Sequence, residues 1–295
     1  MSCPDCFRGA VSTTQTTGTE TTIHGFPTYV AQPENGATTK GIIVIITDAF
    51  GWKFSNNRVL CDRYAKRGGF LVYCPDFMSG SSMDPRAIAL LDNIMEPAPW
   101  FDTIFYKPIT AIQWMTIALP WILKTRLPVT RARVFSFIQA LRTSSPPFPT
   151  NNLKIGVAGF CWGGKHTLLL AQDEPSSRVR RHNSQINSAN PEPLIDCAFT
   201  AHPALIEVPR DIEDIAIPTN VAIGDEDTFM KVSLVKQMKH VLEVENKGSH
   251  EVTILPGARH GFAVRARPDN EHEMECAEKA EVQAIDWFTR WLART

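Results

Sequence analysis

Cys161 lies in a segment whose residue types could hold a reactive thiol. The segment reads Gly-Phe-Cys-Trp-Gly-Gly over residues 159–164, after an apolar run at 153–158 and before a helical pattern. A nucleophile at a sharp strand-to-helix turn needs small neighbours, and the start of the helix stabilises a thiolate and offers backbone N–H groups to an oxyanion. The pattern predicts a cysteine nucleophile for acyl chemistry; the alternative is a buried cysteine in a tight turn.

A cysteine nucleophile needs a base and an acid that orients the base. Asp225, Glu226 and Asp227 follow an apolar run at 220–224, and His260 follows another at 251–255. Both groups come just past the carboxyl end of a predicted strand, where an open parallel sheet places its active site. We expect His260 to be the base and Asp227 to orient it, with Asp225 and Glu226 as solvated loop charges.

The elements that must position these residues alternate along the chain. Short, mostly apolar runs predict strands buried on both faces at 42–47, 70–75, 153–158, 197–201, 220–224 and 251–255. Helical periodicity falls between and after them, at 56–67, 131–141, 163–172, 232–242 and 272–292. This alternation favours an α/β fold with a mainly parallel sheet flanked by helices, and residues 28–31 are expected to add an antiparallel edge.

One stretch interrupts the alternation. Residues 77–128 are too many for a simple crossover, so we expect a single domain over residues 1–295 with a cap-like insertion at about 78–150. The stretch is rich in aromatic residues: Trp100, Phe101, Phe105, Tyr106, Trp114 and Trp121. Their simplest role is the insertion's own core, and the wall of a pocket is the second.

These ordered motifs resemble the dienelactone hydrolases of the α/β-hydrolase fold, over nearly the whole chain outside the insertion. Members carry a Gly-Phe/Tyr-Cys-x-Gly-Gly elbow, an Asp-x-Phe after a later strand and a His-Gly/Ser-Phe; the matching residues here are Cys161, Asp227 and His260. The resemblance favours Asp227 over Asp225. Members also have an acid two residues before Phe-Gly after the first central strand, which corresponds to Asp48.

The resemblance implies further roles. In bacterial members a glutamate contacts the nucleophilic thiol, and Asp48, one methylene shorter, stands in its place. The amides of Ala49 and Trp162 would form the oxyanion hole. Bacterial members bind the substrate carboxylate with an arginine, but Val264 stands at the expected spacing and Arg265 one residue later. The remaining substrate-contact candidates are Tyr106 and Trp114 in the insertion. His202, at the end of the strand at 197–201, is expected to be a hydrogen-bonded structural histidine, and a substrate contact is the alternative.

Composition limits the partners and the location. The chain has 30 Lys plus Arg against 31 Asp plus Glu, a net charge of -1, so we expect neither nucleic acid nor a membrane as a partner. Its first 20 residues lack a basic region leading into an apolar one, and the cytoplasm is the expected location, with seven reduced cysteines. Cys3 and Cys6 have CxxC spacing, but no second pair accompanies them, so no metal is expected.

The sequence thus predicts a hydrolase that cleaves a small-molecule lactone or ester through an acyl-enzyme on Cys161, without a cofactor. One alternative is a lyase, isomerase or cyclase of a biosynthetic pathway that uses the same site. A second alternative is a non-catalytic binding protein of the same fold. The sequence leaves open the identity of the substrate, the choice between hydrolysis and a non-hydrolytic step, and whether the chain is a monomer or a homodimer.

Overall fold

An eight-stranded sheet forms the centre of the protein in the computed structural model, which describes residues 11–34, 38–95 and 97–293. The strand order is β1-β2-β4-β3-β5-β8-β9-β10. The strands from β4 to β10 are parallel, whereas β1 and β2 join them as an antiparallel edge. Their bounds are β1 Thr19–Ile23, β2 Phe26–Ala31, β3 Ile42–Ile46, β4 Leu71–Pro75, β5 Ile155–Phe160, β8 Cys197–Ala201, β9 Thr219–Gly224 and β10 His250–Leu255.

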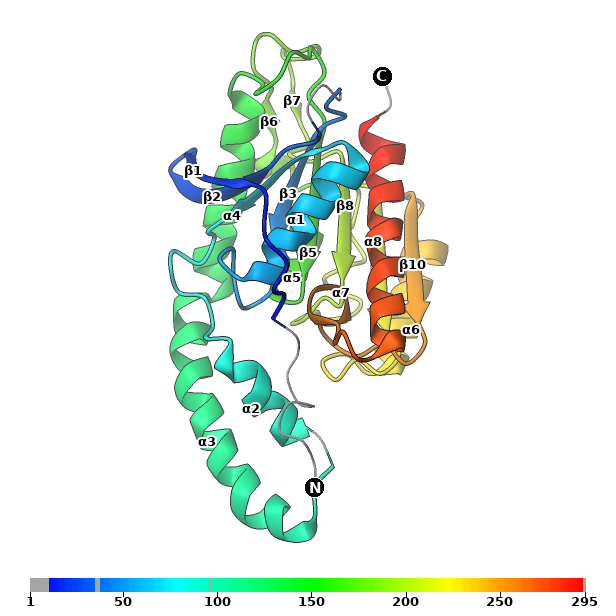
Figure 1. Cartoon of the computed structure of the whole chain (residues 1–295). Coiled ribbons are helices and arrows are strands. Elements are labelled where there is room, and N and C mark those ends of the chain that lie inside the picture. Colours follow the sequence, from blue (N-terminus) through cyan, green and yellow to red (C-terminus); the bar gives the residue numbers. More distant parts are fainter. Residues whose placement is uncertain (1–10, 35–37, 96, 294–295) are drawn as a thin grey trace.

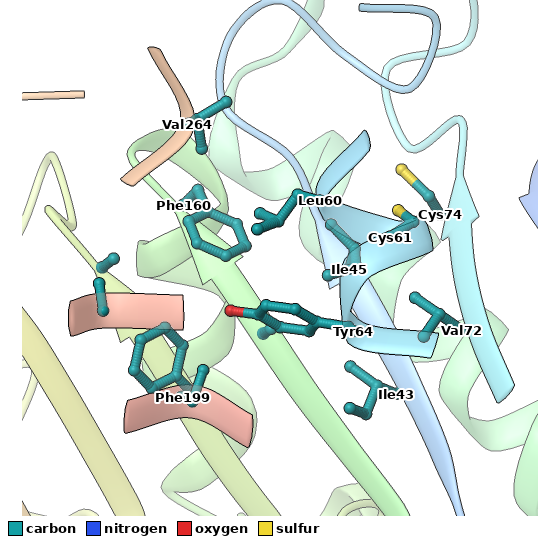
Figure 2. Packing of buried hydrophobic residues seen from close by; sticks show 14 of the residues in the cluster. Ile43, Ile45, Leu60, Cys61, Tyr64, Val72, Cys74, Phe160, Phe199 and Val264 are labelled. Atoms are coloured by element: carbon teal, nitrogen blue, oxygen red, sulfur yellow. The ribbon is translucent and has the colours of Figure 1, made fainter. Parts of the chain in front are cut away.

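Helices cover both faces of this sheet (Figure 1). On one face α1 and α8 pack over a core that includes Tyr64, Phe199 and Phe288; Figure 2 shows part of this packing. On the other face α4, α5 and α6 bury a second core that includes Phe137 and Met238. The helices are α1 Ser55–Gly68, α2 Arg86–Met95, α3 Trp100–Lys124, α4 Leu127–Thr143, α5 Trp162–Ala171, α6 Val232–His240, α7 Phe262–Arg265 and α8 Glu271–Leu292.

The six strands predicted from apolar runs are confirmed, each within two residues of the expected bounds. They could be predicted because every residue of β3, β4, β5, β8 and β9 is buried, which requires continuous apolar sequence. The expected antiparallel edge is also present. The sequence did not reveal β1, a small pair of strands at Val179–Arg180 and Pro191–Glu192, or a π-helical turn at Val241–Glu245, which extends α6.

The helices α2 and α3 form a hairpin that projects from one end of the sheet (Figure 1). Within the range expected for the insertion, α4 instead packs on the sheet through side chains such as Val134 and Phe137. The expectation that the aromatic residues form a core within the insertion is wrong for four of the six. Trp100, Phe101, Phe105 and Tyr106 are 48 to 73% exposed, and only Trp114 and Trp121 are largely covered.

Although α3 has 25 residues, no helix in the described part of the chain is long and apolar enough to cross a membrane.

Candidate active site

Cys161 occupies a strained turn between β5 and α5. Its backbone φ is 52° and its ψ is -113°, a left-handed conformation that costs energy for any residue with a Cβ. The flanking glycines make the turn possible, because a Cβ on Gly159 would collide with the Thr167 hydroxyl and one on Gly163 with the backbone carbonyl of Ile46. The expected elbow is therefore present, and it holds the thiol at the carboxyl edge of the sheet, at the amino end of α5.

His260 and Asp227 meet at the same edge, on the loops that follow β10 and β9. His260 Nδ1 lies 3.0 and 2.9 Å from the two carboxylate oxygens of Asp227. The carboxylate also accepts a hydrogen bond of 2.8 Å from the Phe229 amide, which fixes its orientation. Both side chains are buried. Asp227 therefore holds the proton on Nδ1 and leaves Nε2, which has no hydrogen-bond partner among the described residues, to face the chemistry.

The pKa of His260 is raised to about 9. Burial lowers the pKa of this imidazole, but the negative charge of the Cys161 thiolate and the hydrogen bond to Asp227 outweigh burial. A raised pKa means that the imidazolium persists as the pH rises, until about pH 9.

Removing the thiol should lower this pKa. In Cys161→Ala the imidazole keeps its burial and its bond to Asp227 but loses the anion that favours its charged form, so we expect the pKa of His260 to fall below its wild-type value. Titration of the His260 Cε1–H signal by NMR measures the change. An unchanged pKa would show that Asp227 alone maintains the charge and that no thiolate faces the ring.

Asp48 is buried at the end of β3, and its contacts differ from those of the thiol-contacting acid that the resemblance implies. One oxygen accepts hydrogen bonds from Asn57 Nδ2 at 3.0 Å and from the Phe50 amide at 3.1 Å. The other oxygen lies 3.4 Å from Arg265 Nε, an ion pair without hydrogen-bond alignment. Burial raises the pKa of Asp48, and Arg265 partly offsets this. Among the described residues, Asp48 thus contacts Asn57, Phe50 and Arg265, whereas no hydrogen bond joins it to Cys161.

Arg265 lines the pocket beside the histidine, but Asp48 balances its charge. Its guanidinium also lies over the Phe50 ring, 5.2 Å from the centroid, and its side chain is 13% exposed. The pair Asp48 and Arg265 connects the loop after β3 to the short helix α7, which directly follows His260. The sequence did not indicate this pair, because the two residues are more than 200 positions apart.

A cavity of about 470 Å³ opens over Cys161 and His260. Its wall is mostly apolar, and it includes side chains from the loop after β3, from α2, from α3 and from the loop after β9, such as Phe50, Ile88, Trp114, Trp121 and Phe229. The hairpin of α2 and α3 thus forms one side of the cavity. Ala49 and Trp162 also line the cavity, and neither backbone amide donates a hydrogen bond within the described part of the chain.

The four tentative substrate-contact residues lie in different places. Trp114 and Arg265 line the cavity. Tyr106 is 59% exposed on α3 and is not one of the lining residues. His202 is fully buried behind His260, with the two rings 5.0 Å apart and edge to face. Burial lowers the pKa of His202 well below its usual value, and the nearby charges of His260 and Arg265 add to this, so His202 is a neutral support for the base.

Two expected loop charges also gain definite contacts. Asp225 Oδ1 accepts a hydrogen bond of 2.7 Å from the Gly257 amide. This bond joins the loop after β9 to the loop after β10, so Asp225 is more than a solvated charge. Glu226 is largely exposed and lies 3.7 Å from Arg259.

Within residues 11–34, 38–95 and 97–293, no cluster of His, Cys, Asp and Glu could hold a metal ion. The CxxC pair Cys3 and Cys6 lies outside the described residues.

Comparison with known proteins identifies the family of this chain. The family model of the dienelactone hydrolase family matches residues 26–181 and 183–292. The hydrolase pyvD of Aspergillus violaceofuscus is 23% identical, covering 98% of this chain and 96% of its own. A carboxymethylenebutenolidase homolog of Xenopus tropicalis is also 23% identical, over 93% of this chain and 91% of its own. A crystal structure of a putative dienelactone hydrolase from Klebsiella pneumoniae superposes with a TM-score of 0.56 at 22% identity, covering 94% of this chain and 100% of that one. Because the family model matches nearly the whole length of the chain, this protein belongs to the dienelactone hydrolase family.

Proposed function

We propose that this protein hydrolyses a lactone or activated ester through a thioester intermediate on Cys161. One observation carries the proposal: a cysteine at a strained elbow and a histidine held by Asp227 line the floor of one apolar cavity. The names of the relatives, hydrolase and carboxymethylenebutenolidase homolog, agree with this chemistry.

The proposed reaction has two steps. Cys161 Sγ attacks the acyl carbon, and the amides of Ala49 and Trp162 hold the resulting oxyanion. The acyl C–O bond then breaks, and the His260 imidazolium donates its proton to the leaving oxygen. Neutral His260 next takes a proton from water, which attacks the thioester, and the thiolate leaves with the acid as product.

The thiol restricts the substrate to activated acyl groups. A thiolate leaves a tetrahedral adduct more easily than an ordinary alkoxide does, so an adduct with a simple alkyl ester returns to substrate. An enol ester or enol lactone has a better leaving oxygen, and its adduct proceeds to the thioester. We therefore propose an activated lactone or ester as the substrate class.

Polar groups in the cavity wall favour a substrate that also carries oxygen atoms. Trp114 Nε1 and Trp121 Nε1 are buried donors that have no hydrogen-bond partner among the described residues. His166 also lines the cavity; its Nε2 lies 3.1 Å from Thr130 Oγ1, and its Nδ1 has no such partner. Unpaired buried donors cost about 1–3 kcal/mol each, so a ligand with oxygen acceptors near the indoles gains selectivity.

The decisive experiment follows the label from water. The enzyme is incubated with an enol lactone in H₂¹⁸O, and the intact protein is analysed by mass spectrometry after rapid acid quenching. We expect an adduct of substrate mass on the peptide that contains Cys161 and one ¹⁸O atom in the product acid. An unlabelled isomeric product would instead assign the site to an isomerase or cyclase. A Cys161 thiol no more reactive than the buried cysteines would identify a binding protein.

The cap should control which substrates bind. Trp114→Ala removes part of the cavity wall, so we expect KM for a bulky ester to rise about tenfold, equivalent to about 1.4 kcal/mol, with a smaller change for a small activated ester. Tyr106→Ala, on the same helix but outside the wall, is the matched control and should leave both values unchanged. Alkylation of Cys161 by iodoacetamide should proceed at the wild-type rate in both variants. A uniform loss on all substrates with a lower Tm would show that Trp114 acts through packing alone.

A further inference from the structure

The outer side of α3 carries an unusually large apolar surface. This side, called here the apolar face, projects with the hairpin of α2 and α3 away from the sheet (Figure 1). Each of its large side chains is between 46 and 66% exposed: Phe101, Ile104, Phe105, Ile109, Ile112, Met115, Leu119, Ile122 and Leu123. Of these, Ile122 also contributes to the wall of the cavity over Cys161.

The area of this face matches a protein interface. Two half-exposed phenylalanines of about 200 Å² each and seven smaller, half-exposed aliphatic side chains offer on the order of 700 Å² of apolar surface. The largest patch on a typical monomer is about 300–600 Å², whereas a stable interface needs about 800 Å² from each partner. The face is therefore larger than the largest apolar patch of a typical monomer and close to what one partner contributes to a standard interface.

The spacing of the face indicates a helix as the occupant. Residues 101, 105, 108, 112, 115, 119 and 122 alternate steps of four and three, and all seven are apolar, with Pro108 among them. A period of 3.5 residues is the seam along which two helices pack side by side. The seam runs for about 32 Å along the helix, much longer than a pocket for a compact ligand.

We propose that a second copy of this chain covers the apolar face, with α3 packed antiparallel against its counterpart about a two-fold axis at Ile112. In this register Phe105 of one protomer lies opposite Leu119 of its partner, and Phe101 lies opposite Leu123. Bulky aromatic side chains near one end of the helix thus meet smaller aliphatic ones near the other end, which allows close packing along the whole seam. A two-fold interface also uses one patch twice, as homodimers do.

Charge fixes the direction of the pairing. The charged residues of α3 are Asp102 near its start, Lys107, and Lys124 at its end. Lys107 donates a hydrogen bond of 3.0 Å to the Ile94 carbonyl on α2, so it is turned toward the hairpin. Antiparallel pairing brings Asp102 beside Lys124 of the partner subunit and opposes the two helix dipoles, whereas parallel pairing puts like charges together.

A lipid surface is the other occupant that such a face could suit. Helices that lie on membranes carry lysine and arginine along their polar side. The polar positions of α3 instead include Thr103, Thr110 and Gln113, with Lys107 directed at α2. These uncharged positions favour a second copy.

The first experiment measures the oligomeric state. Sedimentation equilibrium should show a dimer for the wild type and a monomer for Ile112→Lys, because two lysines would meet on the two-fold axis. The matched control Gln113→Lys adds the same charge at the next residue, which is exposed but off the seam, and it should remain dimeric. Iodoacetamide should alkylate Cys161 in Ile112→Lys at the wild-type rate, which shows that the monomer is folded. A wild type that stays monomeric, or a dimer that survives Ile112→Lys, would overturn the proposal.

The second experiment tests the register. Phe105→Cys and Leu119→Cys proteins, each with Cys3→Ser and Cys6→Ser, are mixed and oxidised. Antiparallel pairing predicts a disulfide between the two different variants and little within either one. Disulfides within each variant would reveal parallel packing and contradict the proposal. Flotation of a monomeric wild type with phosphatidylcholine vesicles would assign the face to a lipid surface instead.

Discussion

Replacement of Cys161 by serine is expected to lower kcat/KM for an activated ester by about two orders of magnitude or more, with little change in Tm. The elbow accepts serine, because the flanking glycines provide the space and the side chain differs by one atom. The serine hydroxyl is not expected to act as the nucleophile in place of the thiol, because His260 must then deprotonate a far weaker acid than a thiol. Steady-state kinetics measure kcat/KM, and a thermal melt measures Tm.

Cys161→Ala provides the reference for this experiment. It keeps the turn but removes the nucleophile, so its rate should fall to that of the uncatalysed background while its Tm stays close to wild type. A serine variant as active as wild type would contradict the view that the site depends on sulfur.

Asp227→Asn should reduce kcat by about 10³- to 10⁴-fold, the loss expected when the orienting carboxylate of a triad becomes neutral in place. The amide still accepts the hydrogen bond from the Phe229 amide, but it no longer stabilises the His260 imidazolium and it permits the wrong tautomer. We also expect a lower pKa for His260, because Asp227 helps to raise it. A pH profile of kcat measured beside Tm separates this effect from unfolding.

Asp225→Asn is the matched control two residues away. Its amide oxygen can still accept the hydrogen bond from Gly257, so the contact between the two loops remains. We expect kcat to fall by less than about threefold, which corresponds to a change of less than about 1 kcal/mol in the activation free energy. A larger defect at Asp225 than at Asp227 would reverse the assignment of the orienting acid.

The sheet, and the meeting of Cys161, Asp227 and His260 at one of its edges, could be predicted from the sequence because each depends on local signals. A strand buried on both faces must be apolar throughout, and the glycines beside Cys161 mark a turn that larger residues cannot adopt. His260 and Asp227 follow directly after such strands. The parallel arrangement then brings three distant segments to one edge without further information.

The pairing of Asp48 with Arg265 could not be predicted in this way. The resemblance led to the expectation of a thiol-contacting acid, and the side chain is buried near the site, but its partner is determined by tertiary packing. The exposed aromatic residues of α3 are the opposite case. From the sequence, an apolar helix such as α3 is expected to be buried in a core. In the structure only one side of α3 is covered, where it faces the cavity, and four of the six aromatic residues are exposed.

The packing around His260 has a consequence for the order of events during turnover. The Phe229 and His202 rings lie 4.4 and 5.0 Å from the imidazole on centroid distances, and Asp227 holds Nδ1, so the ring has little room to rotate. In the proposed reaction, proton delivery and water activation would both occur at one position beside Nε2, which the leaving oxygen must vacate before water arrives. The leaving oxygen of a lactone stays tethered to the acyl group, and a tethered nucleophile can act at an effective concentration of about 10⁵ M or more. Ring closure therefore competes with hydrolysis, and the yield of product depends on how quickly the freed hydroxyl arm turns away from His260 into the cavity.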